Sequence, residues 1–216
     1  MSLYVYAFVD APGGPMTIAR HRLEILSIGG IHVAVERLAA SPVASEAALR
    51  TQHAIVDRLS RTFAAVLPAR FGSFVSPDEL QQMIRPRRVE LGKALRRLRG
   101  RVQMTARIST PVAGSLPPPG VRTPSGTAYL NARRAALSGP RPRLAAALSE
   151  AVHTLARDER IETDAARGRT ALFHVIDRAD VRRYRAMVER FAAAEGERVI
   201  VTGPYAPFAF TPVLQP

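Results

Sequence analysis

The most constraining feature of the sequence is a short apolar stretch, residues 66–76 (VLPARFGSFVS), between two segments with helical periodicity. Pro68 lacks a backbone N–H and therefore belongs at the start or the edge of a strand. Gly72 permits a bend or a close backbone approach. We expect a short buried strand here, followed by a bend. The stretch carries one charge, Arg70, and a guanidinium is costly to bury alone. We therefore expect Arg70 to bond a carboxylate or backbone carbonyls.

The helix after this stretch is predicted to begin at Ser76. Serine is a good N-cap, Pro77 suits the first helical position, and Glu79 completes a capping box. Pro86 should kink or split the helix, and Gly100 should end it. The apolar residues that recur with helical spacing should form its buried face: Leu80, Ile84, Leu91, Leu95 and Leu98.

The first half of the chain also predicts a helix at residues 45–65 and strands before it. Strands are expected at residues 3–9, 23–28 and 31–38, the last two joined as a hairpin by a Gly29-Gly30 turn. The helix should bury a stripe spaced by four and three residues: Leu49, His53, Val56, Ser60 and Phe63.

The second half alternates predicted strands and helices. Strands are expected at 102–108, near 161–166, at 169–176 and at 198–202, with helices at 126–137, 143–160 and 180–195. This order is the βαββαβ order of a ferredoxin-like plan. We therefore expect an α+β protein of two domains, residues 1–99 and 100–216. The second domain would carry a loop rich in proline and glycine at 110–126 and a C-terminal tail at 204–216.

The composition limits the class of protein. A chain of 216 residues with 47% hydrophobic residues can bury a sizeable core. The absence of cysteine excludes disulfides, thiolate metal sites and cysteine nucleophiles. The N-terminus lacks the pattern of a signal peptide, and no apolar run is long enough to span a membrane. We therefore expect a cytoplasmic protein without a membrane partner.

The formal net charge of +13 comes almost entirely from arginine. It favours an anionic partner, or it reflects an arginine-rich composition with a solvated surface. The densest basic run contains no aromatic residue, so the stacking platform of a protein that binds single-stranded nucleic acid is absent. A basic nucleic-acid-binding module is therefore the alternative rather than the main expectation. The cations of this run are Arg85, Arg87, Arg88, Lys93, Arg96, Arg97, Arg99, Arg101 and Arg107.

No familiar catalytic or cofactor motif is present. The sequence contains no phosphate-binding loop, dinucleotide fingerprint, zinc-protease helix or nucleophile elbow. His53 and Asp57 lie four residues apart on a predicted helix, but a metal site needs at least a third ligand. The acids at residues 158–164 fit a solvated helix end better than a pair of catalytic carboxylates. We expect no catalytic site, no bound metal and no cofactor.

Three separated motifs resemble the gas vesicle protein F/L family. VLPARFG at residues 66–72 is similar to the family's L-P-x-R-F-G segment, and GTAYL at 126–130 is similar to its G-x-A-Y-L helix. VTGPYAPFAF at 201–210 resembles the family's ending V-T-G-P-W-P-P-Y-S-F, with Tyr205 at the usual tryptophan and Ala206 at a proline. The resemblance covers nearly the whole chain in the right order.

The resemblance implies a non-enzymatic accessory or minor structural protein of gas vesicle assembly, located in the cytoplasm or on the vesicle. It implies an α+β N-terminal domain and a modified ferredoxin-like C-terminal domain. Its partners would be the hydrophobic shell protein and other accessory proteins, bound to support nucleation. The sequence indicates no oligomeric state.

Two groups of residues are candidates for particular roles, the first from the fit to the family's L-P-x-R-F-G segment and the second from a physical hypothesis about how a shell subunit is bound. The first group has a structural role, with its two large apolar residues packed in the N-terminal core: Leu67, Pro68, Arg70, Phe71, Gly72 and Ser76. The second group combines aromatic residues with prolines and could cover an apolar helix or lend a sheet edge to the shell protein: Gly203, Pro204, Tyr205, Pro207, Phe208 and Phe210.

Overall fold

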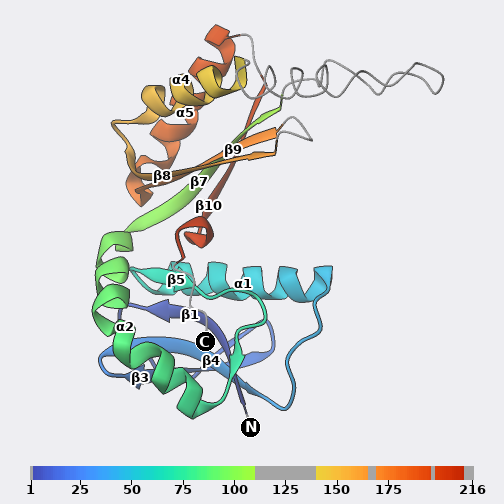
Figure 1. Cartoon of the computed structure of the whole chain (residues 1–216), viewed down its shortest axis with the longest axis vertical. Helices are drawn as coiled ribbons and strands as arrows, with labels where there is room; N and C mark the ends of the chain where they lie inside the picture. The colour runs from blue at the N-terminus through green and yellow to red at the C-terminus, as the bar shows by residue number, and fades with distance from the viewer. Residues whose placement is uncertain (1, 110–139, 165–168, 196–197, 212–216) are drawn as a thin grey trace, which may run out of the picture. The chain divides into compact units, whose positions relative to one another are not determined.

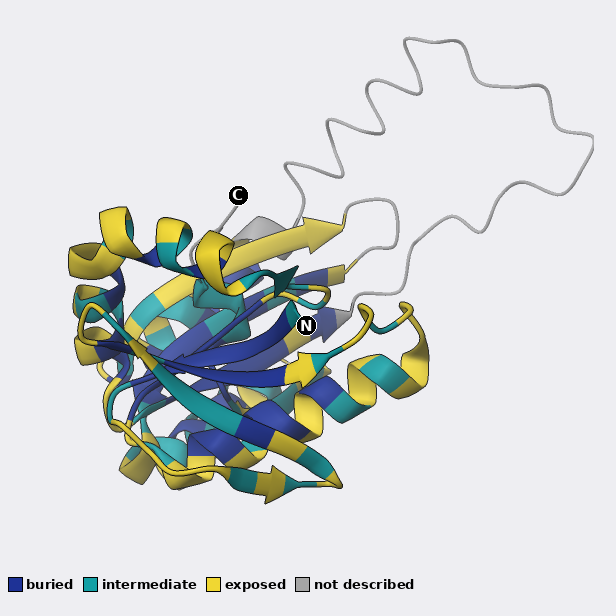
Figure 2. Cartoon of the chain, turned by 90° about the horizontal axis from the view of Figure 1, so that it is seen from below, coloured by how far each residue is buried: buried dark blue, intermediate teal, exposed yellow. Residues whose placement is uncertain are grey.

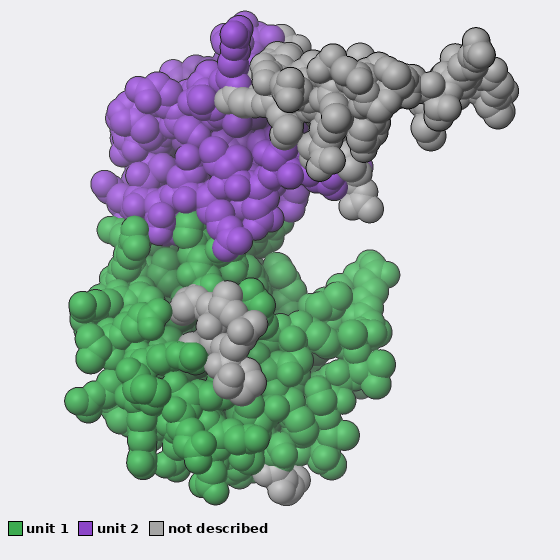
Figure 3. All heavy atoms as spheres, viewed as in Figure 1, with its two compact units in different colours: residues 1–103, 204–216 green, residues 104–203 purple. Residues whose placement is uncertain are grey.

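The protein has a mixed α+β fold with antiparallel sheets, seen in a computed structural model that describes residues 2–109, 140–164, 169–195 and 198–211 (Figure 1). The predicted loop at 110–126, the predicted helix at 126–137 and the GTAYL motif lie outside these residues. The chain forms two compact units, one of residues 1–103 with 204–216 and one of residues 104–203 (Figure 3). The C-terminal tail, which the sequence grouped with the second half, thus falls in the first unit.

The first unit is built on a six-stranded sheet with the order β2-β3-β4-β1-β5, and β6 also pairs with β1. The predicted hairpin is confirmed, because Ile28 pairs with Ile31 across a turn in which Gly29 and Gly30 have φ angles of 57° and 84°. Positive φ at both central residues is the geometry of a type I′ turn, which glycine adopts without strain. The strands are β1 (Ser2–Val9), β2 (Met16–Ile18), β3 (His21–Ile28), β4 (Ile31–Leu38), β5 (Val66–Pro68) and β6 (Phe74–Val75).

Strand β1 is the core strand of this unit, and its residues 3–9 are all buried. Figure 2 shows the buried residues of the chain, in dark blue, along the central strands. Both of its faces are therefore covered. Tyr4 and Tyr6 belong to a cluster with Ile55 and Leu59 of helix α1 (Glu46–Thr62). On the other face, residues of β1 line a cavity together with residues of helix α2 (Pro77–Leu98).

Helix α2 follows the sequence prediction closely. Ser76 is its N-cap, the Ser76 hydroxyl accepts from the N–H of Glu79, and the Glu79 carboxylate accepts from the N–H of Ser76. Its buried residues are the five that the pattern predicted, and Gly100 follows its end with a φ angle of 70°. The helix runs through Pro86 as one element, so the predicted split does not occur.

The predicted stripe of helix α1 is only partly correct. The helix was predicted at residues 45–65 and spans Glu46–Thr62, with Ser45 as its N-cap, but Leu49 is 51% exposed and His53 is exposed. The buried face is rotated slightly about the helix axis relative to the predicted stripe, so the predicted residues lie along the edge of that face. The buried residues are Gln52, Ile55, Val56, Leu59 and Ser60.

The second sheet has four strands in the order β10-β7-β9-β8. Its elements are β7 (Arg101–Ser109), α4 (Pro140–Val152), β8 (Ala156–Asp164), β9 (Arg169–Asp177), the 3-10 turn η1 (Arg178–Asp180), α5 (Val181–Glu195) and β10 (Val199–Tyr205). The predicted helix at 143–160 is wrong at its end, because α4 stops at Val152 and residues from Ala156 pair antiparallel with β9. Residues 158–164 therefore lie in a strand, and the expectation of a solvated helix end there is also wrong.

Candidate functional site

Residues 69–73 form a loop that the edge of β1 holds in place. The N–H of Ala69 donates to the carbonyl of Tyr6 at 2.8 Å, and the N–H of Val5 donates to the carbonyl of Ser73 at 2.8 Å. Inside the loop, the N–H and the hydroxyl of Ser73 both donate to the carbonyl of Arg70, at 3.2 and 2.8 Å. These bonds connect β5 to β6 and fix the backbone on both sides of the arginine.

The buried Tyr4 also holds this loop in place through its hydroxyl. The Tyr4 hydroxyl donates to Oε1 of Gln52 at 2.5 Å and accepts from the N–H of Gly72 at 3.1 Å. The amide nitrogen of Gln52 in turn donates to the carbonyl of Ala69 at 3.1 Å. Phe71 packs edge-on against the Tyr4 ring, with the centroids 6.3 Å apart. Burial raises the pKa of Tyr4, so the hydroxyl keeps its proton and can act as a donor.

The sequence interpretation did not include Tyr4 or Gln52 among the site residues. Gln52 is a polar residue on the buried face of α1, with 5% of its surface exposed. A buried amide must be hydrogen-bonded, so a stripe drawn through Gln52, Ile55 and Leu59 would have signalled the contact. Among the other motif residues, Phe71 was expected in the N-terminal core but is only half-buried. Leu67 is fully buried, and Gly72 has a φ angle of 82°, in the left-handed region that glycine favours.

The expected partner of Arg70 is absent from the described residues. Its side chain is exposed, and no carboxylate or carbonyl in the described part of the chain bonds its guanidinium. The expectation that Arg70 would be buried and paired is therefore wrong. The apolar residues beside Arg70 extend into the protein, whereas the fixed loop directs the side chain of Arg70 toward solvent.

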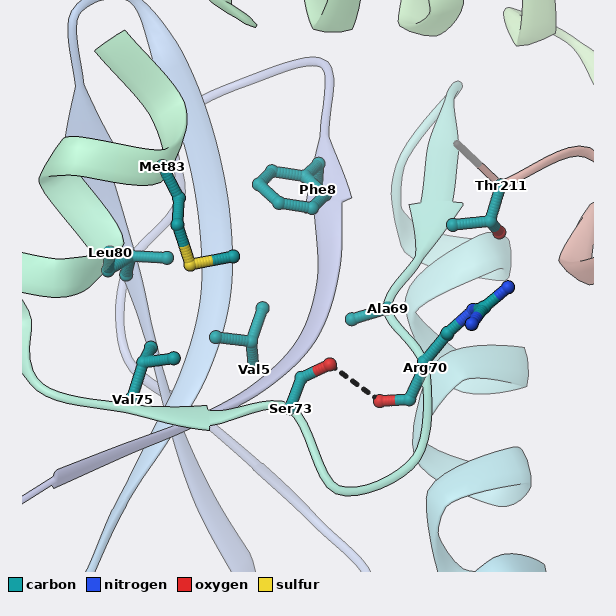
Figure 4. Close-up of a pocket in the computed structure, with 9 residues that line it drawn as sticks. All are labelled: Val5, Phe8, Ala69, Arg70, Ser73, Val75, Leu80, Met83 and Thr211. Atoms are coloured by element: carbon teal, nitrogen blue, oxygen red, sulfur yellow. Dashed lines mark hydrogen bonds between the residues drawn. The ribbon is translucent and has the colours of Figure 1, made fainter. Parts of the chain in front are cut away.

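The Arg70 side chain lies at the rim of a small cavity of about 30 Å³ between β1 and α2. Figure 4 shows Val5, Phe8, Leu80 and Met83 directed into this space. The hydroxyl Oγ1 of Thr211 is buried at the same site and bonds no described residue. The lining residues are Val5, Phe8, Ala69, Arg70, Ser73, Val75, Leu80, Met83 and Thr211.

The C-terminal tail packs on helix α1 of its own chain. The ring of Phe208 stacks on His53 with centroids 5.5 Å apart and an interplanar angle of 13°, and Tyr205 meets His53 edge-on at 5.4 Å.

The tail is also held by contacts outside α1. Ala206 is buried in the core cluster of the first unit, and the N–H of Ala209 donates to Oε1 of the buried Gln103 at 2.8 Å. Residues 208–210 form a 3-10 turn, η2 (Phe208–Phe210).

The six candidate tail residues are thus not equivalent. Gly203 has a φ angle of 111°, and its carbonyl accepts a hydrogen bond from the guanidinium of Arg185. Pro207 is buried and Pro204 is exposed, whereas the three rings are half-buried: Tyr205, Phe208 and Phe210.

The comparison with known families decides the identity. Residues 2–212 match the sequence model of the family described as "Gas vesicle synthesis protein GvpL/GvpF". The chain belongs to this family. Its fold is similar to that of the crystal structure of gas vesicle protein GvpF from Microcystis aeruginosa, with a TM-score of 0.79, 15% identity, and coverage of 98% of this chain and 99% of that one. It is also similar to GvpF from Anabaena sp. PCC7120, with a TM-score of 0.76, 15% identity and 98% coverage of both chains. No curated protein matches the chain.

The basic run of this GvpL/GvpF protein is mostly a solvated helix face. On α2, Arg85 donates to the side chain of Gln81, and directly after the helix Arg99 pairs with Asp10 at 3.3 Å. Val89, among these cations, is 60% exposed. None of the helices within the described ranges is both long and apolar enough to cross a membrane.

In this GvpL/GvpF protein the imidazole of His174 on β9 is fully buried. Its Nε2 lies 2.8 Å from the carboxylate of Glu159, and its Nδ1 lies 2.7 Å from the hydroxyl of Tyr184. The Ser149 hydroxyl donates to the same Glu159 oxygen at 2.5 Å rather than to the imidazole. A serine nucleophile needs the imidazole as its base, so this arrangement lacks the contact that would activate Ser149.

Metal binding has no support in the described ranges, where no three acidic or histidine side chains gather as ligands. The two residues considered as metal ligands from the sequence, His53 and Asp57, make other contacts instead. His53 packs against the tail rings, and Asp57 pairs with Arg61 at 2.8 Å.

Proposed function

We propose that this chain is a non-enzymatic assembly protein of gas vesicles that binds the shell protein and other accessory proteins to support nucleation. The observation that carries the proposal is the match to the GvpL/GvpF family over residues 2–212. The likeness of the fold to two GvpF crystal structures is consistent with it. By this proposal the protein acts in the cytoplasm and at the vesicle, without a catalytic site or a cofactor.

The proposal is tested by expressing the gas vesicle genes of the source cell in a host that lacks them, with and without this chain. We expect light-scattering vesicles that collapse under pressure only when the chain is present, and affinity-tagged chain should capture the shell protein. Undiminished vesicle formation without the chain would contradict an assembly role. Vesicle formation without capture would contradict binding to the shell protein.

We propose that the half-buried rings of the tail contribute to that binding through the surface they leave accessible. Deleting residues 204–216 is a poor test, because Ala206 belongs to the core and the deletion would disturb the fold itself. A better variant is Phe210→Ser, with Val43→Ser as the control, because Val43 is 84% exposed and far from the tail in sequence. Reduced capture by the Phe210 variant alone is the expected result, and equal capture by both would contradict a role of the ring.

For the architecture we propose the two α+β domains inferred from the sequence, at residues 1–99 and 100–216, with a ferredoxin-like second domain. The sheet order β10-β7-β9-β8 supports this, because numbering its strands along the chain gives the order 4-1-3-2 with a helix after the first and third strands. The position of the tail in the first unit suggests assigning residues 204–216 to the N-terminal domain instead.

A second candidate function is binding to nucleic acid, which the exposed cations of α2 favour. Neutralising several phosphates makes affinity fall steeply with salt. We expect DNA binding at low salt to be weak and not to depend on sequence. Tight binding that survives physiological salt would favour this alternative over the assembly role.

A further inference from the structure

The cavity beside Arg70 has walls of apolar side chains from two elements that are firmly held. Val5 and Phe8 extend from β1, and Leu80 and Met83 extend from α2 (Figure 4). Its volume of about 30 Å³ is roughly twice what one water molecule requires. An apolar space of this size holds the end of a small aliphatic side chain, whereas cofactors occupy pockets of several hundred Å³.

Two polar groups at the cavity have unused bonding capacity. The guanidinium of Arg70 bonds no described residue, and it can form two parallel hydrogen bonds with a carboxylate. The hydroxyl of Thr211 is buried and also lacks a partner among the described residues, although buried hydroxyls are normally bonded. A ligand that combined an apolar end with oxygen atoms would satisfy both groups at once.

The loop that carries Arg70 is ordered before any partner arrives. Its backbone is bonded to β1 on both sides, through Ala69 and Ser73, and to the Tyr4 hydroxyl through Gly72. Binding therefore requires ordering of the Arg70 side chain but not of the loop. Such preorganisation favours affinity because less conformational entropy is lost on binding.

We infer that this cavity is a pocket for a segment of a partner protein that presents a small aliphatic side chain next to an aspartate or glutamate. The aliphatic end fills the space between β1 and α2, the carboxylate pairs with Arg70, and a carbonyl of the segment accepts from Thr211. Charge complementarity supports an acidic partner, since the chain itself has a net charge of +13. The inference rests on the proposed function in that it specifies how the chain recognises another protein.

The test uses two matched peptides, acetyl-Ala-Val-Glu-Ala-amide and its Gln analogue, and the full chain labelled with ¹³C at its methionine methyl groups. Met83 lines the cavity, so its methyl signal reports occupancy; a Met83→Leu variant assigns that signal. We expect the Glu peptide to shift the signal at millimolar concentration and to bind up to about fivefold more tightly than the Gln peptide, as for an exposed ion pair. Binding that does not move Met83, or equal affinity for both peptides, would overturn the inference.

Two variants separate the charge from the cavity. Arg70→Gln should abolish the preference for Glu, whereas Arg88→Gln, an equal change of charge on the exposed face of α2, should keep it. Ala69→Val, which adds two carbons at the cavity wall, should abolish binding of both peptides while its circular dichroism stays that of the parent. A preference that survives Arg70→Gln would overturn the role of Arg70.

The occupant could instead be the chain's own C-terminal end. A Met83 signal that moves when residues 212–216 are deleted, in the absence of peptide, would assign the cavity to these residues and overturn a partner site. These measurements use purified chain without any vesicle protein. Their failure would reject the pocket alone, whereas the vesicle-formation assay tests the assembly role alone.

Discussion

The hydroxyl of Tyr4 lies 2.5 Å from Oε1 of Gln52, a residue 48 positions later in the chain. This contact joins the core strand to helix α1, and both residues also bond the loop that carries Arg70, through Gly72 and Ala69. One buried pair thus connects the sheet, the helix and the candidate site.

The variant Tyr4→Phe should destabilise the first unit by about 1–3 kcal/mol, because it leaves Oε1 of Gln52 and the N–H of Gly72 without their partner. Urea unfolding followed by circular dichroism measures the change. Tyr205→Phe is the control, since the Tyr205 hydroxyl makes no bond to the described residues and its ring contact with His53 remains. Equal effects of the two variants would contradict the anchoring role of the Tyr4 hydroxyl.

Arg70 and Arg99 should differ in their effect on stability. Arg70→Gln should change the free energy of unfolding by less than about 0.5 kcal/mol, as for a surface residue without a partner. Arg99→Gln should cost about 1 kcal/mol, because its partner Asp10 has a side chain only 11% exposed and would be left unpaired. The same urea experiment compares them, and a larger loss for Arg70→Gln would show that its guanidinium has a structural partner.

The tail should behave as part of the first unit. Phe208→Ala removes the ring stacked on His53 and should lower stability by about 2 kcal/mol, less than for a core phenylalanine because the ring is half-buried. Amide hydrogen exchange should then become faster at residues 205–211 and in α1. Pro204→Ala changes an exposed residue of the same segment and serves as the control. Unchanged exchange in α1 would contradict the docked tail.

The second unit should lose stability in mild acid through His174. Burial lowers the pKa of His174 below its ordinary value of 6.5, and the hydrogen bond and charge of Glu159 oppose part of this change. The groups that face the imidazole are Glu159 from β8 and Tyr184 from α5. As pH falls below 6.5, the unfolded chain takes up a proton that the folded chain does not yet bind. Stability therefore falls from this pH down to the pKa of the folded state.

A His174→Gln variant should lack this dependence. Its loss of unfolding free energy between about pH 7.5 and pH 5.5 should be smaller than that of the parent, by up to about 1 kcal/mol. Thermal unfolding at several pH values, compared between the two chains, cancels the contribution of the other titrating groups. Parallel pH profiles would contradict the prediction.

The sequence predicted best where local chemistry decides the structure. The capping box of Ser76 and Glu79 is formed by residues three apart, and the turn at Gly29-Gly30 requires backbone angles that glycine provides. The buried stripe of α2 follows from its spacing. None of these features depends on what lies across the fold, so sequence patterns were sufficient for them.

The sequence misled where distant residues decide. Residues 156–164 (ARDERIETD) are highly charged and lack apolar alternation, and the sequence predicted a helix up to residue 160 with a strand only near 161–166. They form β8 because they pair with β9, and their charges are tolerated because the strand lies at the edge of the sheet. The stripe of α1 was likewise misplaced. His53 contacts a ring of the tail instead of the core, and Gln52 lies on the buried face of the helix.

The sequence by itself determined the family, through motifs spread along the chain, and the class of local structure in the stretch at 66–76. A proline and a glycine restrict the backbone there whatever surrounds them. Only the tertiary structure decided that Arg70 faces outward beside a cavity, that Thr211 closes the same site, and that the tail packs on α1. Exposure and partnership depend on which elements meet, and that is set by the packing of segments far apart in the sequence.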